Sequence, residues 1–484
     1  MSGEVVDTTK ELGTRNIGSL LWKYALPAVV TQIIATIYNL VDSIFLGHAE
    51  NGSLILAALA IVLPIMNIIH AFGSLVGAGA SARMSIVLGR KDVRWAEKIL
   101  GNSMHLTFFF GVLFLSAGYL FMKPILSMFG ASATTIMLAE QYLDIVLPGM
   151  FLTTIAFNLT GLIRSSGYPR RAMWILAGGA VLNIILDTIF IYALDWGIAG
   201  AAWATTISMA CSAVAAILHF INPKSFIHFT RDCWSPRWYI FLNILSIGLS
   251  PFLMNVAASG VVALLNRQLI RYGNLVMPGG GDLAVGACGI SNTFGALLVM
   301  FILGVCQGMQ PIAGYNYGAG RQERLKEVFT LTLKVNILFG TAGALTGVLF
   351  PQTLLRIFTT DADLIRIGTP AMRYLLVMWG IIAFTITNSN FFQSIDKPWI
   401  AIVTSLSRQV IFLAPMIYIL PPLYERMNLH GLTGIWMSCA VSDVLGAVLA
   451  GSLLLTQRHI FRPGYQAPPR RQRKAFRPSP GDEA

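Results

Sequence analysis

The chain has few charged residues for its length. Asp, Glu, Lys and Arg make up 12% of its 484 residues, whereas apolar residues make up 55%. Soluble domains have about twice this charged share. The mean hydropathy is +0.67, and runs of about 20 apolar residues recur along the chain. This composition excludes an ordinary soluble protein and predicts a polytopic membrane protein.

Cysteine is also scarce. The chain has five cysteines, and they occur without a CxxC motif or a Cys/His spacing of the kind that binds zinc. A disulfide framework and a structural metal site are therefore not expected. We interpret as small packing residues Cys211, Cys233, Cys288, Cys306 and Cys439.

The motifs of several enzyme and pump classes are missing. The chain has no HExxH and no G-x-S-x-G, and its seven histidines are dispersed. A G-x-x-x-x-G-K-[ST] phosphate loop is absent as well. We expect neither an enzyme, nor an ATP-driven pump, nor a cofactor other than a coupling ion. The first 16 residues are polar, so we expect an uncleaved first span in place of a signal peptide.

The apolar runs predict twelve membrane spans, centred near residues 34, 68, 108, 149, 183, 209, 252, 296, 339, 382, 408 and 444. Only helices suit runs that are long and lack a two-residue alternation. The fold class is therefore an all-α polytopic membrane protein. The net charge of +12 does not indicate nucleic acid binding, because the basic residues cluster at the ends of the spans.

Basic residues also predict the orientation of the chain. If both termini are cytoplasmic, most Lys and Arg lie on the inner side. The outer side then keeps only Lys123, Arg267, Arg271, Arg356, Arg366, Arg373 and Arg426. We therefore expect both termini in the cytoplasm.

The two halves of the chain repeat one another in the same order. The matching segments are 24–27 with 247–251, 87–97 with 317–327, and 197–203 with 431–437. Such a parallel repeat predicts two six-helix lobes related by an axis along the membrane normal. We expect an N-terminal lobe at 1–221, a cytoplasmic linker at 222–238 and a C-terminal lobe at 239–460. Residues 461–484 are expected to form a basic, disordered tail that is attracted to anionic lipid or simply anchors the topology.

Two carboxylates stand out inside apolar spans. Asp42 and Asp187 each lie in such a run, where a charged group costs roughly 2.5 to 3.5 kcal/mol on insertion scales. The predicted orientation brings Asn183, Thr205 and Tyr142 to a similar depth, and Asn183 shares a helix face with Asp187. We predict that these five side chains converge in the outer half of the first lobe.

The chemistry of such a group has three interpretations. Two neighbouring carboxylates can share one proton. Together with amide and hydroxyl oxygens they can also form a site for Na⁺. The third interpretation is a structural hydrogen-bond network. Pro27 lies earlier in the first span, where it either provides a bend that responds to the ion or a static kink.

The second lobe does not repeat these acids. Its intramembrane charges are Arg408 and Asp443, which we expect to form a structural bridge, with contact to substrate as the alternative. Methionine, aromatic and amide side chains suit an adaptable cavity for cationic or amphipathic compounds, although such residues also fill ordinary cores. The cavity candidates are Met254, Asn255, Asn292, Met300, Phe384, Asn388, Phe391 and Arg408.

The chain resembles the multidrug and toxic compound extrusion (MATE) family over nearly its whole length. The resemblance rests on the segments 26–27, 38–47, 167–169, 182–191 and 197–206. It implies a twelve-helix, two-lobe fold and cation-coupled drug efflux. The family's first-lobe cation site maps onto Asp42, Asn183, Asp187 and Thr205. The resemblance also implies that Pro27 and Tyr142 lie near this cation site, with Asn158 as a looser candidate.

One branch of the family has acids in the seventh and tenth spans. Here the nearest polar residues are Asn266 and Asn388, so the chain looks more like the branch that relies on the first lobe. The implied function is secondary active efflux of organic cations or amphipathic drugs in exchange for H⁺ or Na⁺, by a monomer in a bacterial or archaeal inner membrane. A lipid-linked oligosaccharide flippase is the alternative, although only Arg408 and Lys334 offer internal positive charge. A membrane-embedded enzyme is a weaker alternative.

Overall fold

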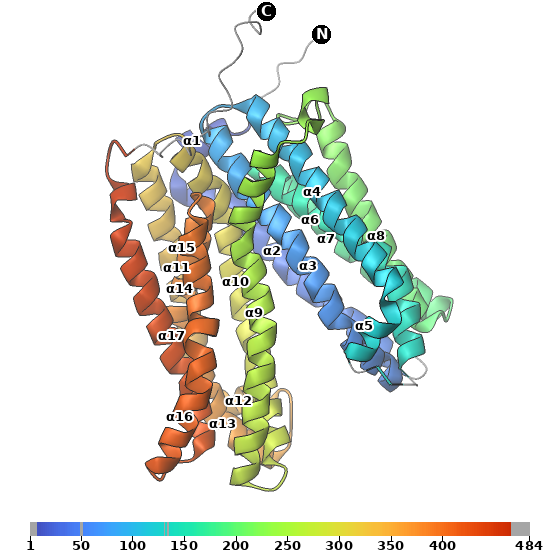
Figure 1. The fold of residues 1–484 in the computed structure, drawn as a ribbon, viewed down its shortest axis with the longest axis vertical. Helices are drawn as coiled ribbons and strands as arrows, with labels where there is room; N and C mark the ends of the chain where they lie inside the picture. The colour runs from blue at the N-terminus through green and yellow to red at the C-terminus, as the bar shows by residue number, and fades with distance from the viewer. Residues whose placement is uncertain (1–6, 49–51, 130, 133–134, 466–484) are drawn as a thin grey trace, which may run out of the picture.

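The computed structural model describes residues 7–48, 52–129, 131–132 and 135–465. Within these ranges the chain is built from helices and turns, without a strand (Figure 1). The first and last described segments, which contain Leu12 and Ile460, contribute to one core and so lie at the same end of the molecule. We call this the terminal end, and the opposite one the far end.

The first lobe begins with a short helix and continues with long helices. Its elements are α1 (Lys10–Thr14), α2 (Ile17–His48), α3 (Gly52–Gly89), α4 (Val93–Leu120), α5 (Met122–Met128), α6 (Ile136–Ser165), α7 (Pro169–Asp187), the π-helix η1 (Thr188–Ala193) and α8 (Gly197–Ile221). A segment with the 3₁₀ turn η2 (Arg231–Trp234) connects α8 to the second lobe. It lies within the predicted linker.

The second lobe has a similar order of elements. These are α9 (Trp238–Val276), α10 (Gly280–Gly318), α11 (Gln322–Leu349), α12 (Pro351–Arg356), α13 (Ala362–Leu376), α14 (Trp379–Ser394), α15 (Pro398–Leu406), the π-helix η3 (Ser407–Leu413), α16 (Ala414–Arg426), α17 (Gly431–Thr456) and the 3₁₀ turn η4 (Arg458–Phe461).

The number of spans agrees with the sequence-based prediction. Eleven apolar helices among the described residues are long enough to cross a membrane, and the bent pair α13–α14 makes a twelfth. The predicted all-α polytopic fold is confirmed. The tenth span differs from the expected uninterrupted helix, since α13 and α14 meet at 43°. At this break Trp379 is buried at 8% exposure and packs against Gly295 and Gly340.

The lobes repeat one another in detail. The turns that follow α3 and α10 each contain one left-handed residue, Lys91 at φ 62° and Gly320 at φ 69°. Each lobe also has a short helix, α5 or α12, after its third long helix, and a π-helix, η1 or η3, in its fifth span. The sequence repeat therefore corresponds to a structural repeat.

The contact between the lobes is reciprocal. Gly89 of α3 lies so close to α10 that a Cβ there would overlap the Tyr315 carbonyl, and a Cβ on Gly318 would overlap the Ile86 carbonyl. The same sequence offset relates Gly89 to Gly318 and Ile86 to Tyr315. This is the self-complementary contact that a two-fold relation produces, and close backbone approach of this kind requires glycine.

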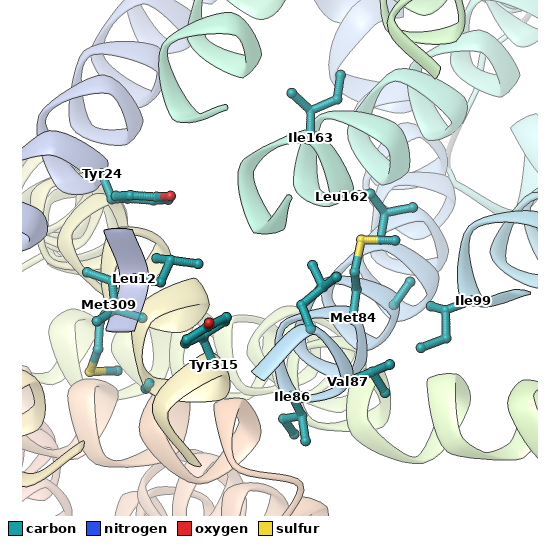
Figure 2. Packing of buried hydrophobic residues seen from close by; sticks show 14 of the residues in the cluster. Leu12, Tyr24, Met84, Ile86, Val87, Ile99, Leu162, Ile163, Met309 and Tyr315 are labelled. Atoms are coloured by element: carbon teal, nitrogen blue, oxygen red, sulfur yellow. The ribbon is translucent and has the colours of Figure 1, made fainter. Parts of the chain in front are cut away.

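The two ends of the molecule are packed differently. At the terminal end a single hydrophobic core includes Met84 and Ile86 of the first lobe together with Met309 and Tyr315 of the second (Figure 2). At the far end the buried apolar residues form separate clusters, one within the first lobe and two within the second. The lobes are thus joined at the terminal end and pack independently at the far end, and the ribbons diverge in that direction (Figure 1).

The beginning of the predicted tail is part of the fold. Phe461 in η4 stacks near Phe391 and Phe329, and the Gln322 side chain donates to the Tyr465 carbonyl at 2.9 Å. Residues 466–484, for which we predicted disorder and lipid attraction, lie outside the described residues.

Candidate cation site

The site is built around the end of α7. Asp187 is the last residue of α7 and precedes the π-helix η1. Asn183 lies one helical turn earlier, so both side chains share a face. Both are buried, with Asp187 at 0% and Asn183 at 2% exposure. π-Helical turns are rare and often occur at functional sites, and this one begins directly after the carboxylate.

A hydrogen-bond chain joins α7 to α8. The Asn183 amide satisfies both of its neighbours in one orientation, in which Nδ2 donates to Asp187 Oδ2 at 3.2 Å and Oδ1 accepts from Thr205 N at 3.3 Å. The opposite orientation gives only a bond from Nδ2 to Thr205 Oγ1 at 3.4 Å and turns Oδ1 toward the carboxylate. We adopt the first orientation because an acceptor facing an acceptor is unfavourable.

Asp42 and Tyr142 complete the group. Asp42 lies in the last part of α2, which packs along α7. Its carboxylate interacts electrostatically with that of Asp187. Tyr142 of α6 is buried at 3% exposure, and it interacts with Asp42, Asp187 and Thr205. The structure therefore brings together all five residues that the sequence analysis expected at one depth.

The group has unused hydrogen-bonding capacity. Oδ1 of Asp42 and Oδ1 of Asp187 are both buried and have no hydrogen-bond partner among the described residues. Unpartnered buried carboxylate oxygens are costly. A proton on one carboxylate would reduce this cost, and so would a small cation bound between the oxygens. The atoms that could bind a cation are oxygens of two carboxylates, a hydroxyl and a phenol. Such hard oxygen ligands suit H⁺ or Na⁺.

Pro27 lies in α2 closer to the terminal end than Asp42. The helix continues through it, and the carbonyl of Pro27 accepts a hydrogen bond from Thr31 Oγ1 at 2.8 Å. Pro251 holds the matching position in α9, where its carbonyl accepts from Asn255 Nδ2 at 3.0 Å. Both prolines thus interrupt the helical hydrogen bonds at the same place in their lobes.

Asn158 lies apart from this group. It follows Tyr142 by more than four turns of α6, roughly 24 Å along the helix axis at 1.5 Å per residue. Its Nδ2 donates to Ser103 Oγ and Thr107 Oγ1 of α4, both at 3.1 Å. This contact joins α6 to α4 within the first lobe, well away from Asp187.

The second lobe has an ion pair in the corresponding helices. Arg408 in η3 and Asp443 in α17 lie 3.3 Å apart. The expected bridge is therefore present. The Asp443 side chain is 6% exposed and that of Arg408 is 27% exposed.

The cavity candidates fall into two groups. Asn255 is exposed and shares a helix face with Phe252, which contacts Phe72 of the first lobe. Met300 accepts a hydrogen bond from Thr36 across the lobes at 2.6 Å. The half-buried Met254 and the exposed Asn292 lie on the same two helices, α9 and α10.

Arg408 forms the ion pair with Asp443, and the remaining three candidates lie elsewhere. Asn388 is fully buried and donates to the Ala450 carbonyl at 2.9 Å. Phe391 is fully buried in the core at the terminal end. Phe384 lines an outer groove of about 500 Å³ between α11, α14 and α17. Residue type alone does not distinguish cavity positions from core positions, because burial in a bundle depends on the neighbouring helices.

Several polar residues that join helices were not predicted from the sequence. Arg164 of α6 donates to Gln307 of α10 at 2.6 Å, and Arg83 of α3 pairs with Asp396 of the second lobe at 3.1 Å. These contacts join the lobes. The sequence pattern of one lobe does not indicate them, because each partner lies in the other lobe. Tyr38, which interacts with Tyr142, precedes Asp42 by four residues, and this spacing could have identified it.

Comparison with known proteins agrees with this architecture. The sequence profile of the MatE family matches residues 27–189 and 273–419, more than half of the chain. The multidrug export protein MepA of Staphylococcus aureus (strain MSSA476) is 25% identical over 428 residues, which cover 88% of this chain and 91% of MepA. MepA of Staphylococcus saprophyticus is 24% identical over 427 residues, with the same coverage.

Solved structures share the fold. A MOP superfamily transporter from Pyrococcus furiosus, described as having a binding pocket of reverse polarity, superposes with a TM-score of 0.84 at 24% identity over 95% of this chain and 99% of its own. A multidrug resistance MATE family transporter in an outward-facing conformation gives the same TM-score, identity and coverage. The profile match, which covers parts of both lobes and includes Asp42, Asn183 and Asp187, identifies this chain as a multi-pass transporter of the MatE family.

Proposed function

We propose that this protein is a secondary active efflux transporter that exchanges H⁺ or Na⁺ for organic cations or amphipathic drugs. Its coupling ion binds in the first lobe, at Asp42, Asn183, Asp187 and Thr205. The relatives named multidrug export protein support the substrate class. The observation that carries the proposal is the pair of carboxylates in apolar helices, each with a buried oxygen that lacks a partner among the described residues.

The ion site connects to transport through helix α2. Asp42 lies on α2, and the same helix packs against α10 of the other lobe near the terminal end. Neutralising the two carboxylates removes the repulsion between α2 and α7, and so changes how α2 packs on its own lobe. Pro27 lies within this contact, since Ala25 packs against Gly308 and Val29 against Gly304, and the helix lacks one backbone hydrogen bond there. Ion binding thereby alters the lobe-to-lobe contact that alternating access requires.

Alternating access needs two lobes that can separate at either end. One of the two states has the lobes in contact at the terminal end and apart at the far end. The shared core at the terminal end and the separate cores at the far end fit this state. With both termini cytoplasmic in the cell membrane, as the basic residues predict, this state is closed to the cytoplasm and open to the outside. In our proposal the transporter acts as a monomer, and membrane lipid contacts its outer surface.

Substrate binds between the lobes, where α9 and α10 face the first lobe. Asn255 and Met300 lie on these faces, and thioether and aromatic groups adapt to ligands of different shape. This position lets the substrate contact both lobes at once. The bound ion and the substrate therefore compete through the position of α2, without sharing side chains.

Purified protein in vesicles tests the proposal. Efflux of a fluorescent cation such as ethidium is measured while Na⁺ and pH gradients are imposed separately. We expect one gradient to drive transport. Asp42→Asn and Asp187→Asn should each lower the coupled rate to that of protein-free vesicles at normal folded yield.

Asp144→Asn is the matched control, because Asp144 is an exposed acid on α6, close in sequence to Tyr142. It should retain wild-type rates. Full transport by Asp187→Asn would contradict the proposed ion site. Transport driven by neither gradient would contradict secondary active efflux, and translocation of a fluorescent lipid-linked oligosaccharide in its place would identify a flippase.

A further inference from the structure

The N-terminal segment of residues 7–15 contacts both lobes at the terminal end. It lies before α2 and includes the short helix α1. Leu12 is fully buried and Thr9 is 2% exposed. In the shared core, Leu12 lies near Met309 and Tyr315 of α10 (Figure 2). A segment this close to a chain end is usually poorly ordered unless it is tied down, so its attachments define its role.

One attachment is to the first lobe. Thr8 Oγ1 donates to the carbonyl of Ser166 at 2.7 Å, in the turn between α6 and α7. The next residue, Gly167, has φ +100°, and a Cβ there would overlap the Thr8 side chain. The turn therefore needs glycine for its backbone conformation and for the close approach of Thr8.

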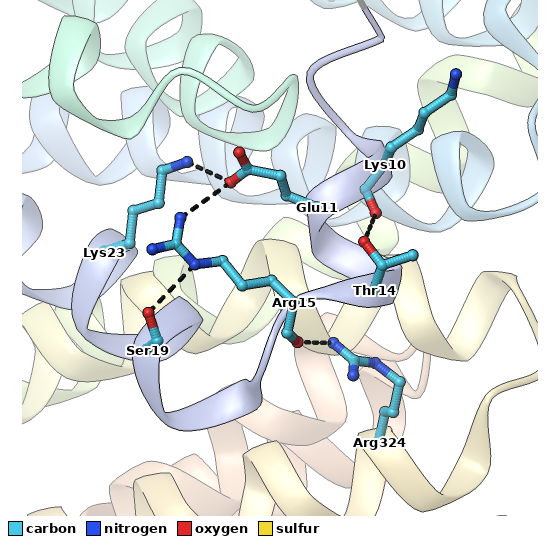
Figure 3. Close-up of polar contacts among 7 residues, drawn as sticks. All are labelled: Lys10, Glu11, Thr14, Arg15, Ser19, Lys23 and Arg324. Atoms are coloured by element: carbon cyan, nitrogen blue, oxygen red, sulfur yellow. Dashed lines mark hydrogen bonds and ion pairs between the residues drawn. The ribbon is translucent and has the colours of Figure 1, made fainter.

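The second attachment is to the other lobe. Arg324 of α11 donates to the Leu12 carbonyl at 3.3 Å. It also donates to the Arg15 carbonyl at 2.6 Å, a bond that Figure 3 shows. Asn316 donates to the same Leu12 carbonyl at 3.0 Å, and Arg321 donates to the Gly13 carbonyl. The last carbonyls of a helix have no partner within it. Here side chains of the second lobe supply their donors.

A third set of contacts sets the position of α1 relative to α2. Glu11 forms ion pairs with Lys23 and, at 3.4 Å, with Arg15 (Figure 3). Since Lys23 belongs to α2, this contact fixes the turn between α1 and α2. The segment is thus held at three places and cannot follow both lobes when they separate.

We propose that residues 7–15 form a strap that gates the terminal end. The strap joins the lobes while this end is closed, and it must detach from Arg324 and its neighbours before this end can open. The proposal rests on the proposed function only in requiring that the lobes separate at this end. Loss of either attachment should shift the equilibrium toward the state that is open at the terminal end.

The distance between the lobes tests the strap directly. Spin labels replace Arg170 at the start of α7 and Arg458 in η4, both exposed at the terminal end, with the exposed Cys211 removed. Pulsed electron paramagnetic resonance in vesicles gives the populations of the short and the long distance. Neither substrate nor an ion gradient is required, so the result does not depend on whether the proposed ion site is correct.

Two variants weaken the strap at opposite ends. Arg324→Gln removes the guanidinium from the two strap carbonyls, and Thr8→Val removes the hydroxyl bonded to Ser166. Hydrogen bonds from charged groups are the stronger kind. We therefore expect Arg324→Gln to raise the ratio of long to short distances by about tenfold and Thr8→Val to raise it by a smaller factor.

Matched controls separate the strap from general effects of substitution. Thr8→Ser keeps the hydroxyl, and Lys326→Gln removes an exposed charge two residues after Arg324. Both should keep the wild-type distances. Unchanged distances in folded Arg324→Gln and Thr8→Val would overturn the proposal, and so would equal shifts in the controls. If Arg324→Gln does not fold, the Thr8→Val and Thr8→Ser pair decides alone.

Discussion

Arg83 and Asp396 form an ion pair at 3.1 Å between α3 of the first lobe and the turn before α15 of the second. The two side chains are 7% and 11% exposed. Asp396 has φ 60°, a conformation that Asp tolerates better than most residues do. A buried ion pair adds little net stability compared with apolar groups, but it is costly to break on one side only. Because the pair joins the two lobes, it favours one particular alignment of the lobes when the terminal end is closed.

Removing one member of this pair should destabilise the protein. We expect Arg83→Gln to cost about 3 kcal/mol of stability and to lower the thermal midpoint in detergent. The double variant Arg83→Gln with Asp396→Asn should recover part of the loss, because no charge remains buried alone. Arg94→Gln removes an exposed charge on α4 and should leave the midpoint unchanged. Strictly additive losses in the double variant would contradict a pair that acts as a unit.

Asn183 should determine ion affinity through its bond to Asp187. Asn183→Leu removes the donor to Asp187 Oδ2. We expect the Na⁺ or H⁺ concentration for half-maximal efflux to change by about tenfold, with folded yield retained. Thr188→Val is the control, because Thr188 begins η1 directly after Asp187 and its hydroxyl donates to the Ile184 carbonyl of the preceding turn. An equal change in both variants would indicate a general effect on the helix.

Much of the architecture could be predicted from the sequence. Apolar run length gave the spans, because every backbone group in a bilayer must be paired within a helix. Intramembrane carboxylates are rare enough that Asp42 and Asp187 identified the candidate site on their own. Helical periodicity then placed Asn183 on the face of Asp187, as the structure has it.

Other features depend on contacts that a single segment does not encode. The pairing of Arg83 with Asp396 requires the two lobes to be docked. The break between α13 and α14 contains no proline, and Trp379 is accommodated there only because Gly295 and Gly340 leave space on other helices. Asn388 and Phe391 are of residue types that often line cavities, but neighbouring helices bury them completely.

The second lobe should not carry the coupling ion. Asp443 already has a positive partner in Arg408 at 3.3 Å, so it has no need of a free cation. We expect Asp443→Asn to change substrate profile or stability while the ion dependence of efflux persists. Measuring efflux at several Na⁺ and H⁺ concentrations, with folded yield as a check, tests this. Loss of ion dependence in folded Asp443→Asn, together with its retention in Asp187→Asn, would place the coupling site in the second lobe and contradict our assignment.

Orientation can be tested by labelling intact cells. A cysteine at Arg458 of the terminal end and another at Asp361 of the far end are both exposed. A membrane-impermeant maleimide should label the Asp361→Cys protein and not the Arg458→Cys protein, because the basic residues predict a cytoplasmic terminal end. Both should react after the cells are permeabilised. The reverse pattern in intact cells would mean that the charge bias fails for this chain.

The attachment of the strap to α2 should depend on pH. The neighbouring Lys23 ammonium, with a smaller effect from Arg15, holds the pKa of Glu11 below its ordinary value of 4.5. A carboxylate whose pKa is lowered in the folded state stabilises that state at higher pH. This contribution is lost as pH falls through the lowered pKa.

A spin label at Lys10 should therefore keep constant mobility from pH 7 to about 4.5 and become more mobile only below that. In Glu11→Gln the label should be mobile throughout, while a label at Arg458 reports any general acid unfolding. A wild-type label that loosens between pH 7 and 5, or a Glu11→Gln label that follows the wild-type profile, would show that this carboxylate does not hold the strap.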